Sequence, residues 1–145
     1  MPSKFPIDTR PTVLIDFDDT LAEYSGYKGW KNLGKPRKYA LTLIRLFRSY
    51  KWTVILYTCR SEIGLLRDWL KHYKFVDSKG KQLVDYINQN PLNAKIDANP
   101  SKPVADLIID NAAFPYCGRP VPLDEVIHGL LDNGILTGDF KKDEN

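Results

Sequence analysis

The arrangement of apolar runs along this chain limits the folds that it can adopt. Residues 12–17, 52–57 and 106–109 are nearly continuous in Val, Ile and Leu, and residues 83–87 form a shorter run. Such runs are typical of strands that are covered on both faces. Between and after them, apolar residues recur at helical spacing. The three helical sets are Ala40, Leu43, Ile44 and Phe47; Ile63, Leu66, Leu70 and Tyr73; and Leu123, Val126, Ile127, Leu130 and Leu131. The alternation predicts a three-layer, doubly wound, Rossmann-like α/β fold, with a mostly parallel sheet and helices on both faces.

The length of 145 residues suits a single domain spanning residues 1–145. We expect residues 1–10 and 139–145 to be tails, because neither segment carries an apolar pattern. Two loops stand out. Residues 23–36 are rich in Gly, Tyr, Lys and Trp, and residues 88–103 contain three prolines and several asparagines.

Composition excludes several classes of protein. No apolar stretch is long enough to cross a bilayer, and the first residues lack the apolar core of a signal peptide, so we expect a cytoplasmic protein. Two distant cysteines, Cys59 and Cys117, do not make a disulfide framework or a zinc site, and Cys59 fits a core position better than a ligand position. The net charge of +3 is too small to indicate nucleic-acid binding but suits an anionic substrate.

Polar residues follow the apolar runs, where the strands are expected to end. Asp16, Asp18 and Asp19 follow the first run, and Thr58 and Arg60 follow the second. In an open α/β sheet, ligands bind just beyond the carboxyl ends of the strands. Three aspartates within four positions repel one another, so we expect a cation between them.

The last run and its surroundings add to this group. Asp110 and Asn111 follow the run, and Lys102 precedes it. Carboxylate oxygens with space for water are the ligands that Mg²⁺ prefers. A carboxylate can attack phosphorus, and a second carboxylate can act as acid and base. A hydroxyl and a lysine can neutralise phosphoryl oxygens in the transition state. These residue types together indicate phosphoryl-transfer chemistry.

These segments resemble the motifs of the haloacid-dehalogenase-like (HAD) phosphatases. "DFDDTL" after an apolar strand resembles motif one of the family, Asp-x-Asp-x-Thr/Val, and "VILYT" resembles motif two. "SKPVADLIIDN" is similar to motifs three and four, a lysine followed by a strand that ends in an acid. The order and spacing fit across residues 12–114. Motif one alone is moderately specific, and four motifs in order are a strong signal.

The resemblance implies a role for each matched residue. Asp16 is the nucleophile and a Mg²⁺ ligand, and Asp18 is the general acid/base and gives its backbone carbonyl to the metal. Thr58 and Lys102 bind the transferred phosphoryl group. Asp110 is the remaining protein ligand of Mg²⁺.

One departure concerns Asn111, which stands where many family members have a second acid. An amide can still orient a metal-bound water, so we expect weaker metal binding. Arg60 is open between a contact to the substrate phosphate and a surface ion pair. Asp19 is equally open between support of the site and turn chemistry.

Simpler interpretations exist for the other residues. Asp18 and Asp110 could close strands as Asx turns, and Thr58 could cap the next helix. Lys102 could be a solvated lysine, and Lys95 is a weaker rival for its role. The segment "GWKNLGK", residues 29–35, is not a P-loop, because proline follows the lysine and no strand leads into it.

The chain lacks room for the cap domain that usually covers this kind of site. We therefore expect a minimal, capless phosphatase acting on a phosphorylated small molecule (metabolite or nucleotide) or on a phosphorylated nucleic-acid end. Alternatively, a second subunit of a homo-oligomer supplies the lid. Residues 23–36 are the candidate flap, although their aromatics could equally pack the loop onto the core. The other function classes are a noncatalytic binding module with a degraded site and, less favoured, a signalling receiver domain.

Overall fold

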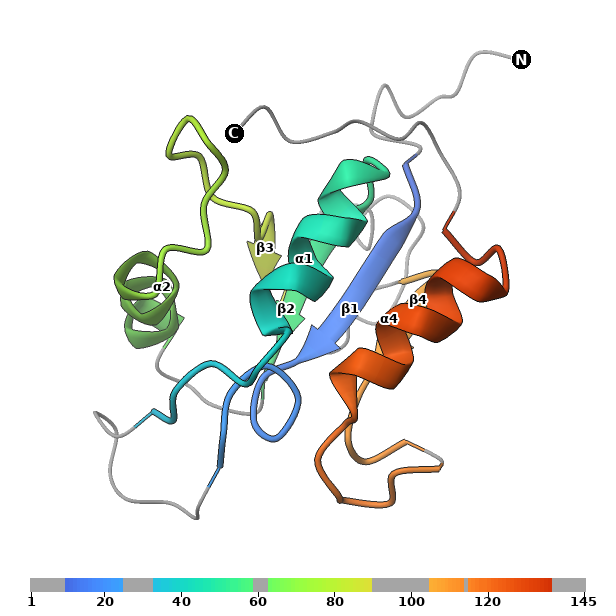
Figure 1. Cartoon of the computed structure of the whole chain (residues 1–145). Coiled ribbons are helices and arrows are strands. Elements are labelled where there is room, and N and C mark those ends of the chain that lie inside the picture. The colour runs from blue at the N-terminus through green and yellow to red at the C-terminus, as the bar shows by residue number, and fades with distance from the viewer. Residues whose placement is uncertain (1–9, 25–32, 59–62, 90–104, 114, 137–145) are drawn as a thin grey trace.

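The centre of the molecule is a four-stranded parallel sheet (Figure 1). The computed structural model describes residues 10–24, 33–58, 63–89, 105–113 and 115–136. The strands are β1 (Thr12–Asp16), β2 (Thr53–Tyr57), β3 (Tyr86–Ile87) and β4 (Leu107–Ile109), in the spatial order β3-β2-β1-β4. This order is the one found in doubly wound nucleotide-binding folds. The predicted Rossmann-like α/β fold is confirmed, and every pairing among these strands is parallel.

The register explains why the central runs lack polar alternation. Val13 of β1 pairs with Val54 of β2 and with Leu107 of β4. Val13 and Val54 face the main hydrophobic cluster, whereas Leu14 and Ile55 face the opposite way and are only 1% and 0% exposed. Both faces of β1 and β2 are therefore buried, which is the environment that favours continuous Val, Ile and Leu.

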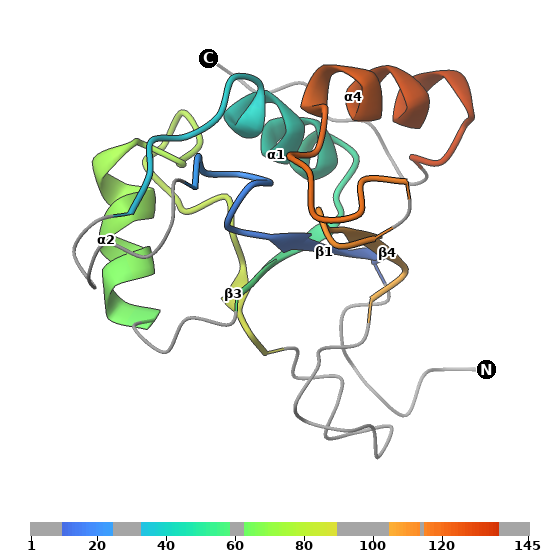
Figure 2. The same ribbon diagram turned by 90° about the horizontal axis from the view of Figure 1, so that it is seen from below.

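Three helices accompany the sheet in the described residues. α1 (Ala40–Ser49) and α4 (Leu123–Asp132) lie over the same face, while α2 (Ile63–His72) lies beside β3 (Figures 1 and 2). Each helix buries apolar residues at helical spacing, as predicted. The loop predicted over residues 88–103 belongs to the connection from β3 to β4, most of which (residues 90–104) lies outside the described residues.

The packing of α2 depends on aromatic contacts. Trp69 meets Phe17 edge to face, with ring centroids 4.9 Å apart, and meets Phe75 at 5.1 Å. Phe17 immediately follows β1, so this contact ties α2 to the end of the central strand. None of the described helices is long and apolar enough to span a membrane.

The prediction of a strand over residues 83–87 was wrong in extent. Only Tyr86 and Ile87 pair with β2. The N–H of Leu83 instead donates to the carbonyl of Phe75, and Val76 bridges Gln82, so this part of the run closes a local turn. Leu83 is buried all the same, which explains its apolar character.

Candidate active site

The carboxyl ends of β1 and β4 bring Asp16 and Asp110 to one edge of the sheet. Ile15 pairs with Ile109, and the two aspartates follow directly on these neighbouring parallel strands. Adjacent strands lie about 4.8 Å apart. From β1, the chain adds β2 and β3 on one side and then β4 on the other side, so the strand order reverses between β1 and β4. Doubly wound folds bind ligands at such a point. The predicted convergence of the first and last acidic strand ends is therefore confirmed in the backbone register.

The electrostatics of Asp16 reflect this crowding. Burial raises the pKa of Asp16 from its usual value of 3.8 to about 7, and the charge of Asp110 adds to the rise. Asp18 contributes in the same direction, whereas hydrogen bonds from Phe17 N–H and the Thr20 hydroxyl oppose it. The Thr20 hydroxyl donates to Asp16 Oδ2 across 3.3 Å. Within the described residues, Asp16 is therefore a carboxylate whose negative charge is poorly compensated, and such a group is a candidate for function.

The loop after β1 is a tight turn organised around one carbonyl. The N–H groups of Thr20, Leu21 and Ala22 all donate to the carbonyl oxygen of Phe17, at 3.3, 2.9 and 3.0 Å. The chain consequently makes a complete loop just beyond the tip of β1 (Figure 1). Asp18 lies at the start of this loop, where it forms a bridge with Ala22.

Asp19 shows its turn role directly. Its φ of 59° is left-handed, a conformation in which aspartate is tolerated better than most residues. Its N–H donates to the carbonyl of Ala22, and its own carbonyl accepts from Val121 N–H. The turn chemistry considered for Asp19 is therefore present. Support of the site by its side chain is untested.

Thr58 lies at the end of β2 and is 5% exposed. The described part of α2 begins at Ile63, and residues 59–62 lie outside the described residues, so a capping role for Thr58 is untested. Its backbone is fixed by Asn88, whose side chain accepts from Thr58 N–H at 2.8 Å and donates to Thr58 carbonyl at 2.9 Å. Sequence reasoning missed Asn88. Its position directly after the apolar run at 86–87 was the signal that could have identified it.

The loop after β4 holds the last predicted metal ligand. Asp110 Oδ1 accepts from Ala112 N–H at 2.9 Å, so the Asx-turn interpretation is correct for this oxygen. The Asn111 amide donates to the carbonyl of Gly118 at 3.5 Å, and Gly118 N–H returns a bond to the Asn111 carbonyl. Asn111 thus closes the loop. The prediction that it weakens metal binding is untested.

The ends of the candidate flap are fastened together. Glu23 N–H donates to the carbonyl of Lys35, and Ala22 forms an antiparallel bridge with Pro36. Gly34 approaches so closely that an added Cβ would overlap the carbonyl oxygen of Glu23. Residues 25–32, the middle of the flap, lie outside the described residues, so its predicted action over the site stays a prediction.

Several predicted site residues are not covered by the description. Arg60 and Lys102, the rival Lys95, and Cys59 all lie outside it. Cys117 is exposed and has a free thiol.

The described residues contain no group of three His, Cys, Asp or Glu side chains arranged to hold a metal ion. Asp16, Asp18 and Asp110 therefore do not form a three-carboxylate cage. The resemblance assigns the backbone carbonyl of Asp18 to the metal, which leaves two carboxylates. Magnesium is commonly held by one or two carboxylates and keeps several waters, so the Asp16 and Asp110 pair fits that ion.

Comparison with known proteins supports the fold. No protein-family model matches the chain, and a search of curated proteins finds no match. A solved structure described as a conserved protein from Bacteroides thetaiotaomicron is similar, with a TM-score of 0.61 and 21% sequence identity. The match covers 86% of this chain and 92% of that one. At this identity the likeness shows a shared α/β fold over nearly the whole length of both chains.

Proposed function

We propose that this protein is a Mg²⁺-dependent phosphatase of the HAD type, which hydrolyses a phosphomonoester through an aspartyl-phosphate. The observation that carries the proposal is that Asp16 and Asp110 directly follow the paired Ile15 and Ile109 at the strand-order reversal, in a setting that leaves the Asp16 charge poorly compensated. The residues of motif one then follow in the tight loop after β1. We also propose a cytoplasmic location.

In the first step, Asp16 acts as the nucleophile. One of its carboxylate oxygens attacks phosphorus, and the bond from phosphorus to the leaving oxygen breaks as the aspartyl-phosphate forms. Asp18 donates its proton to the leaving oxygen, so the product departs as a neutral alcohol. The Thr20 hydroxyl, 3.3 Å from Asp16 Oδ2, helps to hold the attacking carboxylate in place.

In the second step, Asp18 accepts a proton from a water molecule. The resulting hydroxide attacks phosphorus, inorganic phosphate leaves, and Asp16 is regenerated as a carboxylate. Asp18 is protonated again at the end, so the cycle closes without any other reagent. The attacking water of the second step takes the place of the leaving group of the first step. One residue can therefore protonate the leaving group and later deprotonate the water.

The remaining groups manage negative charge. Mg²⁺ bound by Asp16, Asp110 and the Asp18 carbonyl would neutralise the carboxylates and the phosphoryl oxygens, and so permit the approach of two anions. Asn88 positions the backbone of Thr58 at the neighbouring strand end. The Thr58 hydroxyl donates a hydrogen bond to the phosphoryl group. Lys102, and Arg60 if it reaches the substrate, supply positive charge.

The substrate is expected to be a phosphorylated metabolite or nucleotide, or a phosphorylated nucleic-acid end. No cap domain is evident in the described fold, and an open rim admits either class. A second copy of the chain that covers the rim would restrict the choice to small molecules.

The alternatives receive less support. A noncatalytic binding module would explain Asn111, but it gives no role to a poorly compensated Asp16. A receiver domain has the strand order 2-1-3-4-5, whereas this sheet has β1 between β2 and β4.

The decisive test is hydrolysis of p-nitrophenyl phosphate, measured with Mg²⁺ and with EDTA. We expect activity in the wild type that requires Mg²⁺ and falls by about 10³-fold or more in Asp16→Asn, since the substitution removes the nucleophile. Asp106→Asn, at the other end of β4, is the matched control and should retain activity. Equal activity in wild type and Asp16→Asn would reject the mechanism.

A further inference from the structure

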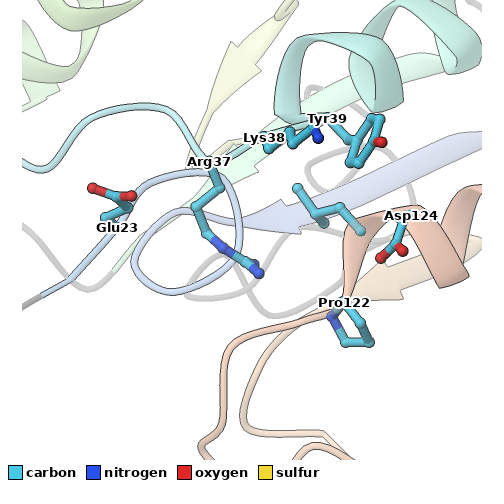
Figure 3. Close-up of a pocket in the computed structure, with 7 residues that line it drawn as sticks. Glu23, Arg37, Lys38, Tyr39, Pro122 and Asp124 are labelled. Carbon is cyan, nitrogen blue, oxygen red and sulfur yellow. The ribbon is translucent and has the colours of Figure 1, made fainter.

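Arg37 reaches from the far end of the flap segment to the loop that follows β1. Its Nη1 donates to the backbone carbonyls of Asp19 and Thr20, each at 3.1 Å. Figure 3 shows the side chain extending from the start of the α1 region toward this loop. No motif in the sequence marked this arginine, because its role depends on a contact across 17 and 18 positions of the chain.

Arg37 and Asp16 are connected through a single residue. Thr20 is 0% exposed, its carbonyl accepts from Arg37, and its hydroxyl donates to Asp16 Oδ2. Any shift of the Thr20 backbone would therefore move the hydroxyl that orients Asp16. Hydrogen bonds from a charged group are stronger than those between neutral groups, so this contact is well suited to hold the loop.

The loop needs holding because Asp19 is in a left-handed conformation at φ 59°. A non-glycine residue in this region persists when surrounding contacts fix it. Asp19 has such contacts from its carbonyl to Arg37 and to Val121 N–H. The Arg37 backbone also holds the same loop, because its N–H donates to the carbonyl of Leu21 at 2.8 Å.

The environment of the guanidinium suits a structural cation. Partial burial lowers the pKa of Arg37, and the nearby carboxylates of Asp19 and Glu23 oppose that fall. Arg37 also lines a cavity of about 460 Å³ between the starts of α1 and α4. Lys38 lines the same cavity, and its Nζ lies 5.2 Å from the centroid of the Tyr39 ring. Among the described residues, Lys38 is therefore a neighbouring cation that does not hydrogen-bond to the loop, unlike Arg37.

We propose that Arg37 is a positioning residue for the nucleophile: it fixes the backbone of Asp19 and Thr20 so that the Thr20 hydroxyl orients the Asp16 carboxylate. The inference rests on the proposed phosphatase function for its catalytic consequence. The structural part, that Arg37 holds the loop, stands on the two hydrogen bonds and can be measured without activity.

The kinetic test compares Arg37→Met with Lys38→Met, using p-nitrophenyl phosphate and saturating Mg²⁺. We expect Arg37→Met to lower kcat by about tenfold or more while KM changes by less than about twofold, since misplacement of a reacting group acts on the chemical step. Lys38→Met should leave both constants within about twofold of wild type. An unchanged kcat in Arg37→Met, or an effect confined to KM, would overturn the proposal.

The second readout is amide hydrogen exchange, measured by NMR on the same variants. The N–H groups of Thr20, Leu21 and Ala22 should exchange about tenfold faster in Arg37→Met, while those of β1 and β2 stay protected. If wild type hydrolyses no phosphomonoester, the proposed function fails and exchange alone decides the role of Arg37. Unchanged loop exchange would refute that role. Should Arg37→Met fail to fold, Arg37→Gln replaces it under the same criteria.

Discussion

Both ends of the parallel sheet carry aspartates, but the two ends treat them differently. At the amino end, Asp85 precedes β3 and accepts hydrogen bonds from Arg48, at 2.8 and 3.0 Å, and from Val54 N–H at 2.8 Å. Asp106 precedes β4 and accepts from Thr12 N–H at 2.8 Å. Each of these carboxylates accepts a hydrogen bond from the backbone of a neighbouring strand, and these bonds stabilise the fold.

At the carboxyl end, Asp16 is surrounded by like charge. Burial raises the pKa of Asp16 most, and the charges of Asp110 and, to a smaller extent, Asp18 raise it further. A residue type that links strands at one end of the sheet is thus electrostatically unfavourable at the other. Sites where a fold tolerates such a cost are candidates for function, because selection for folding alone would remove it. The contrast between the two ends, more than any single motif, makes the carboxyl end the candidate site.

The largest effect that tests this contrast is expected at Asp85. Asp85→Ala leaves the Arg48 guanidinium, whose side chain is 21% exposed, without its ion-pair partner, and removes the acceptor of Val54 N–H. We expect the free energy of unfolding to fall by about 2–3 kcal/mol, measured by urea denaturation. Asp68→Ala on the exposed side of α2 is the control and should change it by less than about 0.5 kcal/mol. An equally small effect at Asp85 would remove the distinction between the two ends.

The sequence predicted the parts of the fold that depend on local pattern. The continuous apolar runs located β1, β2 and β4 to within a residue, and helical spacing located α1, α2 and α4. The extent of β3 was overestimated. Leu83 is buried, but its N–H bonds to Phe75 in a local turn and not to a neighbouring strand. An apolar run predicts burial and does not reveal which segment its backbone bonds to. Burial was predictable there, but pairing was not.

The candidate site was predictable only where residues follow strands. Asp16, Thr58 and Asp110 come at strand ends, and parallel topology brings strand ends together. Asn88 and Arg37 act through contacts with backbone atoms of distant segments. Their partners are carbonyl and N–H groups that every residue carries, so no spacing or composition could identify Arg37, and only the position of Asn88 directly after β3 could have indicated its role.

A smaller effect is expected from the charge of Asp16 on stability. The pKa of Asp16 is about 7 in the folded protein and 3.8 ordinarily, so the folded state binds the proton more tightly. The stability from this group is fully present below about pH 4 and is lost as pH rises through 7. Asp16→Asn carries no charge and avoids this loss. In metal-free buffer it should be more stable than wild type by about 1–3 kcal/mol at pH 8, after allowance for solvent at the rim.

The measurement is urea denaturation of wild type and Asp16→Asn at pH 4, 6 and 8. The difference between the two proteins should grow with pH over this range. A difference that is constant with pH would mean that folding does not raise the pKa of Asp16, and that the two ends of the sheet do not differ in the way described.

The smallest effect is expected from Mg²⁺ itself, and it tests whether the unfavourable end is a cation site. Ligands that bind only the folded state stabilise it, and Mg²⁺ at about ten times its Kd should add about 1.4 kcal/mol, or roughly 5 °C in Tm. Asp110→Asn should lose this shift because it removes one of two carboxylate ligands. Asp106→Asn should keep it, since it changes an acid on the same strand at the opposite end. If both variants respond to Mg²⁺ as the wild type does, the ion acts elsewhere or through ionic strength. The repulsion between Asp16 and Asp110 would then need another counter-charge.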